Sequence, residues 1–275
     1  MATLMSADGA PRAPKLHLIA RAGYAARGII YLIVGGLAGL AALGQGGGTT
    51  DSRGALSTVI AAPFGKGLLA AIALGLLGYS AWRAVQALLD VDDHGANLKG
   101  VAVRSGLAVS AITHAGLALF AVSLAMGWGT GSNGSGDGLS QEWTAWLLGR
   151  PFGPWLVAGV GLAVAGAGVA HIVKGWRADF LRRFDMNPSE RDVISPISRV
   201  GLAARGVAFL IIGGFLVAAA VQNDPSEARG LSGALQALQQ RPFGWVLLGV
   251  LAVGLAAFGA YSLIESVYRR VNVPV

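Results

Sequence analysis

The tripeptide Pro-Phe-Gly occurs three times in this sequence, each time at the start of an apolar run: "AAPFGKGLL" at residues 61–69, "GRPFGPWLV" at 149–157 and "QRPFGWVLL" at 240–248. A mildly amphipathic stretch precedes each copy, which is typical of a short helix lying along a membrane interface. Because proline is favoured in the first turn of a helix, each copy is predicted to begin a spanning helix. The copies are interpreted as structural corners, made of Pro63, Phe64 and Gly65, of Pro151, Phe152 and Gly153, and of Pro242, Phe243 and Gly244.

The composition indicates a membrane protein. Of the 275 residues, 54% are hydrophobic and 13% charged, and the mean hydropathy is +0.59. Soluble domains carry about 25% charged residues. Because about 20 apolar residues cross a bilayer as a helix, six stretches without charge predict six spans. They are Gly28–Thr50, Gly67–Trp82, Ser105–Gly136, Pro151–Val173, Gly206–Asn223 and Pro242–Ile264.

Aligning the three corners divides the chain into three similar units, and the units open with the equivalent residues Arg21, Arg104 and Arg199. Two spans in each unit would insert all units in the same direction, as parallel repeats related by an axis along the membrane normal. The predicted fold is therefore all-α, with six transmembrane helices as three parallel-oriented hairpins in a pseudo-threefold arrangement. The expected boundaries are a tail at 1–16, repeats at 17–92, 100–180 and 197–271, and a linker at 181–196.

The distribution of basic residues predicts the orientation. Only five of the 21 lysines and arginines fall in segments on the corner side of the predicted spans, namely Arg53, Lys66, Arg150, Arg229 and Arg241. Because cytoplasmic loops carry the excess of Lys and Arg, both termini are predicted to be cytoplasmic. The net charge of +7 is then explained by topology, so no nucleic-acid partner is expected. The polar first residues predict no cleaved signal peptide.

These residues resemble the DUF1206 family of bacterial membrane proteins, which share a repeated domain of unknown function. The resemblance rests on the opening motif of each unit, on Pro-Phe-Gly and on the second-helix endings "YSAWRAVQ", "AGVAHIVK" and "FGAYSLIE", and it covers about Ile19 to Arg270. It implies three tandem two-helix units in a bacterial plasma membrane, and no agreed activity. The middle unit departs from the pattern, with Ser110 where the outer units have Arg27 and Arg205.

Ionisable residues inside the predicted spans are the candidate binding residues, because charge at that depth faces a bundle interior or a cavity. Arg27 and Arg205 each follow a boundary arginine by six residues, about 9 Å along a helix. Tyr31, Ser110 and His114 share the equivalent helix stripes. If the stripes converge on the pseudo-threefold axis, these five residues form a cluster suited to an anion or a lipid headgroup.

Structural interpretations of the same residues stay open. Arg27 can extend to the headgroups or pair with Glu265, an acid near the same side of the membrane. His114 is also interpreted as a neutral core histidine held by hydrogen bonds. Such roles would leave the cluster with packing and topology rather than ligand binding.

Two functions follow from this sequence. The first is a non-enzymatic structural, accessory or lipid-interacting membrane protein, with lipids and homo- or hetero-oligomeric contacts as partners. The alternative is a channel, transporter or binding module for a small anion that uses the Arg/Ser/His cluster. We expect no catalytic residue, no metal site and no cofactor, since the chain has no Cys and no motif for hydrolysis or phosphate cradling.

Overall fold

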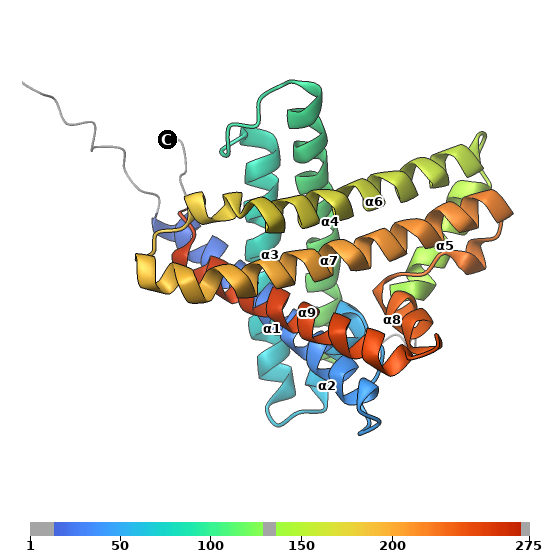
Figure 1. Cartoon of the computed structure of the whole chain (residues 1–275), viewed down its shortest axis with the longest axis horizontal. Helices are drawn as coiled ribbons and strands as arrows, with labels where there is room; N and C mark the ends of the chain where they lie inside the picture. The colour runs from blue at the N-terminus through green and yellow to red at the C-terminus, as the bar shows by residue number, and fades with distance from the viewer. Residues whose placement is uncertain (1–13, 129–135, 271–275) are drawn as a thin grey trace, which may run out of the picture.

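The computed structural model describes residues 14–128 and 136–270, so most of the expected tail at 1–16 lies outside the described residues (Figure 1). The described ranges form nine α-helices and two short 3₁₀ helices, with no strand beyond an isolated bridge between Phe184 and Arg269. The elements are α1 (Pro14–Ala42), α2 (Ser52–Ile60), α3 (Gly65–Leu89), α4 (Leu98–Met126), α5 (Gly136–Leu148), α6 (Gly153–Arg177), η1 (Asp179–Arg183), α7 (Pro188–Gln222), η2 (Pro225–Glu227), α8 (Leu231–Gln239) and α9 (Gly244–Tyr268). The prediction of an all-α fold is confirmed.

Six of these helices are long and apolar enough to cross a membrane: α1, α3, α4, α6, α7 and α9. Even a helix of 25 residues is about 37 Å long, more than the roughly 30 Å of a hydrocarbon core. The protein is therefore a multi-pass membrane protein, as predicted. The segment expected as a linker at 181–196 contains the end of η1 and the start of α7.

The long helices alternate in direction and define two ends of the molecule. We name the end where α1 begins and α9 ends the terminus end, and the end with the three Pro-Phe-Gly tripeptides the corner end. At the terminus end, the guanidinium Nη2 of Arg21 donates a hydrogen bond to the carbonyl of Val267 at 2.9 Å. This contact ties the first spanning helix to the last.

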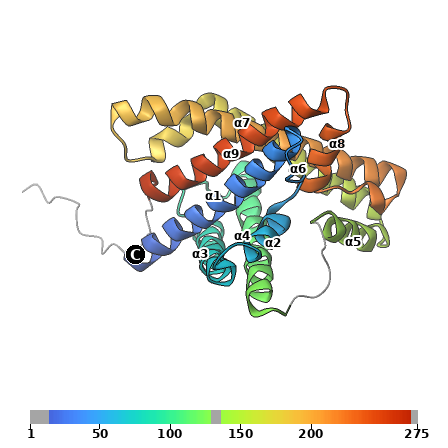
Figure 2. The ribbon, with the colours of Figure 1, turned by 90° about the horizontal axis from the view of Figure 1, so that it is seen from below.

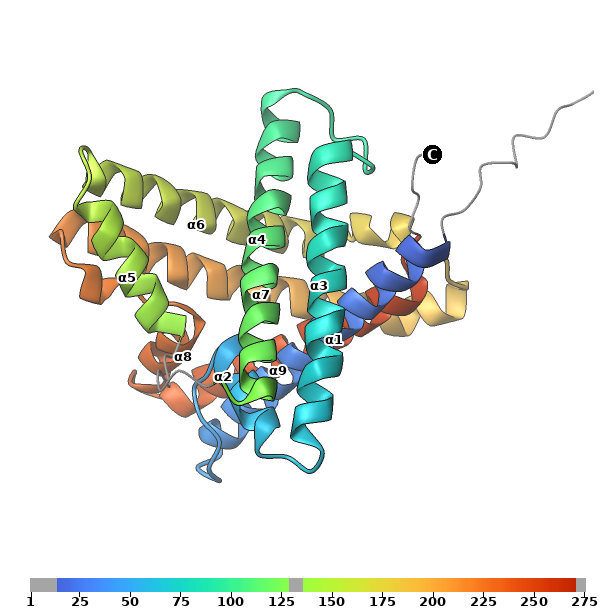
Figure 3. The same cartoon turned by 180° about the vertical axis from the view of Figure 1, so that it is seen from behind.

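The closest helix pairs form between repeats rather than within them. α3 packs along α4, α6 along α7, and α9 along α1, with α1 and α9 in the middle of the molecule (Figure 2). Within repeats, α1 packs on α3 and α7 on α9, but α4 and α6 do not pack along each other (Figure 3). The pseudo-threefold relation therefore holds for all three between-repeat pairs and for two of the three within-repeat pairs. The contacts run in the order α4, α3, α1, α9, α7 and α6, so the six helices form an open ring. We call the missing contact between α4 and α6 the interruption.

Small residues allow the between-repeat pairs to approach closely. A Cβ on Gly28 would lie 2.9 Å from the carbonyl oxygen of Gly259, and one on Gly206 would lie 2.6 Å from that of Gly168. At the equivalent place in the third pair, the hydroxyl of Ser80 donates to the carbonyl of Ala111 at 2.7 Å. The same crossing point is thus used three times, which supports the threefold relation of these pairs.

The interruption is visible at one equivalent glycine in each repeat. A Cβ on Gly23 would lie 2.5 Å from the backbone nitrogen of Tyr79, and one on Gly201 would lie 2.5 Å from that of Phe258. Gly106, the equivalent residue of the middle repeat, has nothing within 4 Å. Gly166 on α6 is equally open. The faces that α1 and α7 bury inside their own repeats are therefore uncovered on α4.

The corners differ in one respect from the prediction, because the helices that follow them, α3, α6 and α9, each begin at the glycine and not at the proline. The amide of Gly65 donates to the carbonyl of Ala62 at 2.9 Å, so Pro63 is the second and Phe64 the third residue of a β-turn. Phe64 has φ 60°, and a positive φ at this place defines a type II turn, which favours proline immediately before it. The same conformation recurs at Phe152 (φ 61°) and Phe243 (φ 59°).

The phenylalanines are exposed and the following glycines are buried. Phe64 is 91% exposed, and Phe152 and Phe243 are each 78% exposed. A left-handed conformation costs a residue with a Cβ about 1–2 kcal/mol. The turn places three aromatic rings on the surface at the corner end, where the predicted structural role requires them.

The predicted short helices before the corners are present as α2, α5 and α8. They also connect neighbouring repeats at the corner end. The carboxylate of Asp137 on α5 accepts hydrogen bonds from the amide of Gly230 and from the hydroxyl of Ser232, both at 2.6 Å. Because Gly230 is the N-cap of α8, the second repeat supplies the capping group of a helix in the third.

Candidate functional site

Arg27 is buried between α1, α3 and α9, with only 4% of its surface exposed. Its Nη2 lies 2.5 Å from Oε2 of Glu265, which is 2% exposed. Its Nε donates to the hydroxyl of Ser262 at 3.1 Å, and its Nη1 donates to the hydroxyl of Tyr79. The guanidinium also lies over the ring of Phe258, 5.1 Å from the centroid. The pairing with Glu265 that the sequence left open is therefore present, and the charge of Arg27 is neutralised.

The Arg27–Glu265 pair belongs to a larger polar network at the terminus-end half of the ring. Arg269 Nη1 lies 2.9 Å from Oε1 of Glu265, and its Nη2 lies 3.4 Å from Oδ2 of Asp92. The hydroxyl of Tyr261 donates to Glu265 at 3.0 Å and accepts from Nζ of Lys174 at 3.3 Å. This network joins α1, α6, α9 and the loop after α3.

The network extends to α3 through a second arginine. Arg83 donates to the hydroxyl of Tyr79 and, at 3.0 Å, to the side chain of Gln86. The amide of Gln86 in turn donates to Asp92 at 2.5 Å. We define the central network as Arg27, Tyr79, Arg83, Gln86, Asp92, Lys174, Tyr261, Ser262, Glu265 and Arg269.

Arg205 has a different environment from Arg27. Its Nη1 donates to the hydroxyl of Tyr31 at 2.5 Å, and its guanidinium lies over the rings of Tyr31, Phe209 and Phe258, between 4.5 and 5.0 Å from their centroids. Within residues 14–128 and 136–270, no carboxylate forms an ion pair with Arg205, and its buried Nε has no hydrogen-bond partner. Among the described residues, its charge is therefore contacted by three aromatic rings and one neutral hydroxyl.

His114 and Ser110 lie on α4 beside the network. Nδ1 of His114 lies 2.8 Å from the carbonyl of Ser110 and 3.5 Å from its hydroxyl. The imidazole packs on the ring of Tyr79 at 4.5 Å between centroids. His171 on α6 repeats the contact with a carbonyl one turn earlier, that of Ala167 at 2.8 Å, and packs on Phe209.

The structure therefore brings the five candidate residues to one region but divides them. Arg27 and Arg205 both lie over the ring of Phe258. His114 reaches this region through Tyr79. Arg27 is enclosed, whereas Arg205, Ser110, His114 and Tyr31 each keep part of their surface exposed. Only the second group could contact a ligand without disrupting an ion pair.

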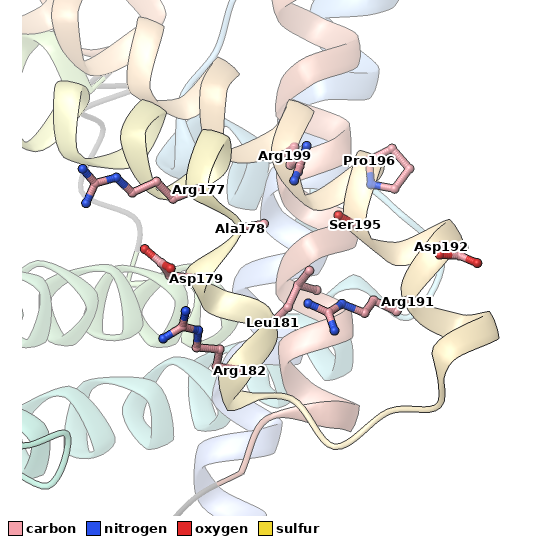
Figure 4. Close-up of a pocket in the computed structure, with 10 residues that line it drawn as sticks. All are labelled: Arg177, Ala178, Asp179, Leu181, Arg182, Arg191, Asp192, Ser195, Pro196 and Arg199. Carbon is pink, nitrogen blue, oxygen red and sulfur yellow. The ribbon is translucent and has the colours of Figure 1, made fainter.

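A cavity of about 440 Å³ opens at the terminus end of the α6/α7 pair (Figure 4). Ten residues line it: Arg177, Ala178, Asp179, Leu181, Arg182, Arg191, Asp192, Ser195, Pro196 and Arg199. Four arginines outnumber two aspartates, so the cavity has a positive charge. Asp179 lies between Arg177 and Arg182 in this view, and Asp192 points away from them. The lining includes Arg199, one of the three boundary arginines.

A family model described as Domain of Unknown Function (DUF1206) matches the chain three times, at residues 22–90, 105–178 and 200–269. The chain belongs to this family. A similar protein is the Uncharacterized protein YxxB of Bacillus subtilis (strain 168), which is 34% identical over 262 residues, or 94% of this chain and 93% of the relative. No solved structure matches the chain. The three matches agree with the three repeats seen in this DUF1206 protein.

Lys174 and Gln86 were not among the candidate binding residues, yet the aligned repeats contain a signal for both. Lys174, Gln86 and Glu265 each follow the proline of their own corner by 23 residues, and they are the last letters of the three aligned endings. Their neighbours His171, Arg83 and Ser262 are also equivalent. The second helices of this DUF1206 protein thus carry polar positions as regular as the arginine positions of the first helices.

Guanidinium and ammonium groups are prominent among the polar side chains of this region. Guanidinium and ammonium groups bind carboxylates and phosphates, the former through two parallel hydrogen bonds. Among the described residues, no group of three His, Asp or Glu side chains is placed to hold a metal ion. The region around Arg27 already contains an anion, the carboxylate of Glu265, whereas no carboxylate of the described residues forms an ion pair with Arg205.

Proposed function

We propose that this DUF1206 protein is a non-enzymatic protein of the bacterial plasma membrane that binds an anionic membrane lipid in the interruption between α4 and α6. The observation that carries the proposal is the missing contact between these two helices. α4 and α6 are the least buried of the six spans, with 17% of their most apolar window buried. In a bilayer, acyl chains occupy such uncovered apolar faces.

The charge around the interruption favours an anionic lipid over a neutral one. Arg205, His171 and Lys174 lie on or beside the α6/α7 pair, and each is partly exposed. The basic cavity of Figure 4 opens at the terminus end of the same pair. Basic groups at the membrane surface attract anionic headgroups by about 1 kcal/mol each.

Lipid retention tests the proposal. Protein purified from a defined mixture of phosphatidylglycerol and phosphatidylcholine should retain phosphatidylglycerol in native mass spectrometry. Filling the interruption with Val109→Trp and Ala163→Trp should remove that lipid, whereas Leu74→Trp on an exposed face of α3 should not. Equal retention of both lipids, or retention unaffected by the double substitution, contradicts the proposal.

The proposed orientation places both termini in the cytoplasm. The chain has no cysteine, so single cysteines can report the side of each end. A cysteine at Lys66 should react with a membrane-impermeant reagent in intact cells, and one at Arg182 should react only after permeabilisation. The opposite result reverses the orientation.

A second candidate is a binding or transport module for a small anion. It is favoured by the partial exposure of Arg205, Ser110, His114 and Tyr31 around one region. Reconstituted protein should then pass a small anion such as chloride or phosphate, and Arg205→Gln should abolish the flux. Absence of flux in the parent protein removes this candidate and leaves the lipid proposal intact.

A further inference from the structure

The three between-repeat pairs place equivalent residues in contact, so their chemistry can be compared position by position. In the α1/α9 pair, Arg27 binds Glu265 and Ser262. In the α7/α6 pair, Arg205 occupies the position of Arg27, while Lys174 and His171 occupy those of Glu265 and Ser262. One pair therefore contains a cation and its carboxylate, and the other contains cations at both positions.

From this reversal we infer that Arg205, Lys174 and His171 form a binding site for a phosphate-bearing anion, which supplies the negative charge that Glu265 supplies to Arg27. The inference rests on the proposed function and deepens it, because it names the headgroup end of the lipid site. The α3/α4 pair serves as the neutral case, with Ser110 and Gln86 at the two positions.

The charges of the central network support an external anion. The network contains four cationic side chains, Arg27, Arg83, Lys174 and Arg269, against the two carboxylates Glu265 and Asp92. Lys174 reaches Glu265 only through the hydroxyl of Tyr261, and Glu265 already contacts two arginines directly. Two positive charges therefore remain, and Arg205 adds a third. Charge without a partner is costly inside membrane-spanning helices, so a bound anion would stabilise this region.

The geometry allows an anion to approach. Arg205 and Lys174 lie over adjacent rings of α9, since Arg205 is 4.5 Å from the centroid of Phe258, Lys174 is 5.7 Å from that of Tyr261, and the two centroids are 5.8 Å apart. The ring of His171 lies 5.5 Å from that of Phe209, which Arg205 also covers. The Nε of Arg205 is buried and has no hydrogen-bond partner in the described chain, so it can complete a two-bond contact with a phosphate after a shift of the side chain.

The basic cavity lies further along the same helix pair, at its terminus end. Lys174 lies one helical turn before Arg177, and Arg205 lies about 9 Å along α7 from Arg199. Both Arg177 and Arg199 line the basic cavity (Figure 4). A phosphate attracted to this cavity therefore meets further cations along the same helix pair. The phosphate belongs either to a lipid headgroup or to free inorganic phosphate, and the chemistry of the site is the same for both.

Lys174→Glu tests the inference, because it rebuilds the α1/α9 chemistry in the α6/α7 pair. Wild-type protein in neutral detergent should show a rise in thermal midpoint on titration with short-chain phosphatidylglycerol. K174E should weaken the apparent affinity about tenfold or more, as expected for the loss of a charge-assisted contact. Lys66→Glu, which makes the same change of charge on an exposed residue at the corner end, should retain wild-type affinity.

Further measurements distinguish a lipid phosphate from free inorganic phosphate, and failure of this site from failure of the lipid proposal. A response to inorganic phosphate alone, removed by K174E, supports the site and assigns free phosphate as the ligand, while the lipid proposal then fails. Lipid retention that is the same in K174E and wild type overturns the site and leaves the lipid proposal standing. If K174E does not fold, Arg205→Gln with Lys174→Gln replaces it, and unchanged affinity in that variant overturns the inference.

Discussion

The α1/α9 and α6/α7 pairs use the same crossing point and reach opposite electrostatic results. Gly28 meets Gly259 in one pair, and Gly206 meets Gly168 in the other. The first pair closes on an ion pair between Arg27 and Glu265, whereas the second leaves Arg205 among aromatic rings. Repetition thus preserves the backbone packing, which depends on small residues, while the side chains beside the crossing are free to change role. A repeat position predicts where a residue lies better than it predicts what the residue does.

Removing the carboxylate of the closed pair should have the largest effect. Glu265→Gln leaves Arg27 without its anionic partner and leaves Arg269 with Asp92 alone, and breaking a buried pair costs about 3–5 kcal/mol. The variant should unfold at a markedly lower denaturant concentration in detergent. Glu142→Gln, on an exposed position of α5, is the control and should behave as wild type. Equal stability of E265Q and wild type would show that the pair is not structural.

The open and closed repeats should respond differently to the same methyl group. Gly23→Ala places a Cβ against the backbone of Tyr79 and should cost about 1–3 kcal/mol. Gly106→Ala, at the equivalent place on α4, meets open space and should be neutral or stabilising by up to about 1 kcal/mol. Thermal unfolding of the two variants measures the contrast. A similar loss in both would mean that α4 and α6 close on each other in the membrane.

A smaller effect is expected at the open pair. Tyr31→Phe removes the hydroxyl that accepts a hydrogen bond from Arg205 and should cost about 1 kcal/mol. Bound phosphatidylglycerol should reduce this cost, because an anion gives Arg205 another partner. The matched measurement is thermal unfolding with and without the lipid. A cost that does not change with lipid argues against an anion at Arg205.

The smallest effect concerns Asp90, which stands at the position equivalent to Arg269 but lies just after α3. Hydrogen bonds from the backbone amides of His94 and Gly95 lower the pKa of Asp90 below its ordinary value. A lowered pKa contributes stability above the ordinary value, and this contribution is lost as the pH falls through the lowered value. Asp90→Asn should therefore flatten the acid side of the stability profile slightly. A profile identical to wild type would show that these loop contacts do not affect folding.

Much of the fold follows from the sequence because each feature has a local cause. The six spans are readable from runs without charge, and the three repeats from Pro-Phe-Gly and the boundary arginines. The predicted starts of α3, α6 and α9 were at the corner prolines, two residues too early. The reason is that Phe64 and its equivalents adopt a left-handed conformation that phenylalanine rarely takes. The phenylalanine alone does not predict this backbone conformation, because the conformation depends on the proline before it and the buried glycine after it.

The interruption of the ring could not be predicted, because hydropathy reports whether a helix is apolar and not which neighbour it contacts. One difference in the middle repeat is consistent with the interruption. Ala167 stands where the outer repeats have Tyr79 and Phe258, which pack on the glycines of their own repeats. At the site, spacing alone found Arg27 and Arg205 and suggested Glu265 as a partner. The candidate role of Lys174 becomes apparent only when the second helices are aligned, because Lys174 then occupies the position of Glu265.

The pairing of α1 with α9 has a consequence for how the chain is made. α3 and α4 are joined by a short loop and can pair as soon as both have been synthesised, and the same is true of α6 and α7. Arg27 lies on α1, whereas its carboxylate partner Glu265 lies on α9, 238 residues further along the chain. A polypeptide that stops before α9 therefore keeps an unneutralised arginine in α1. That charge is neutralised only once α9 has been synthesised.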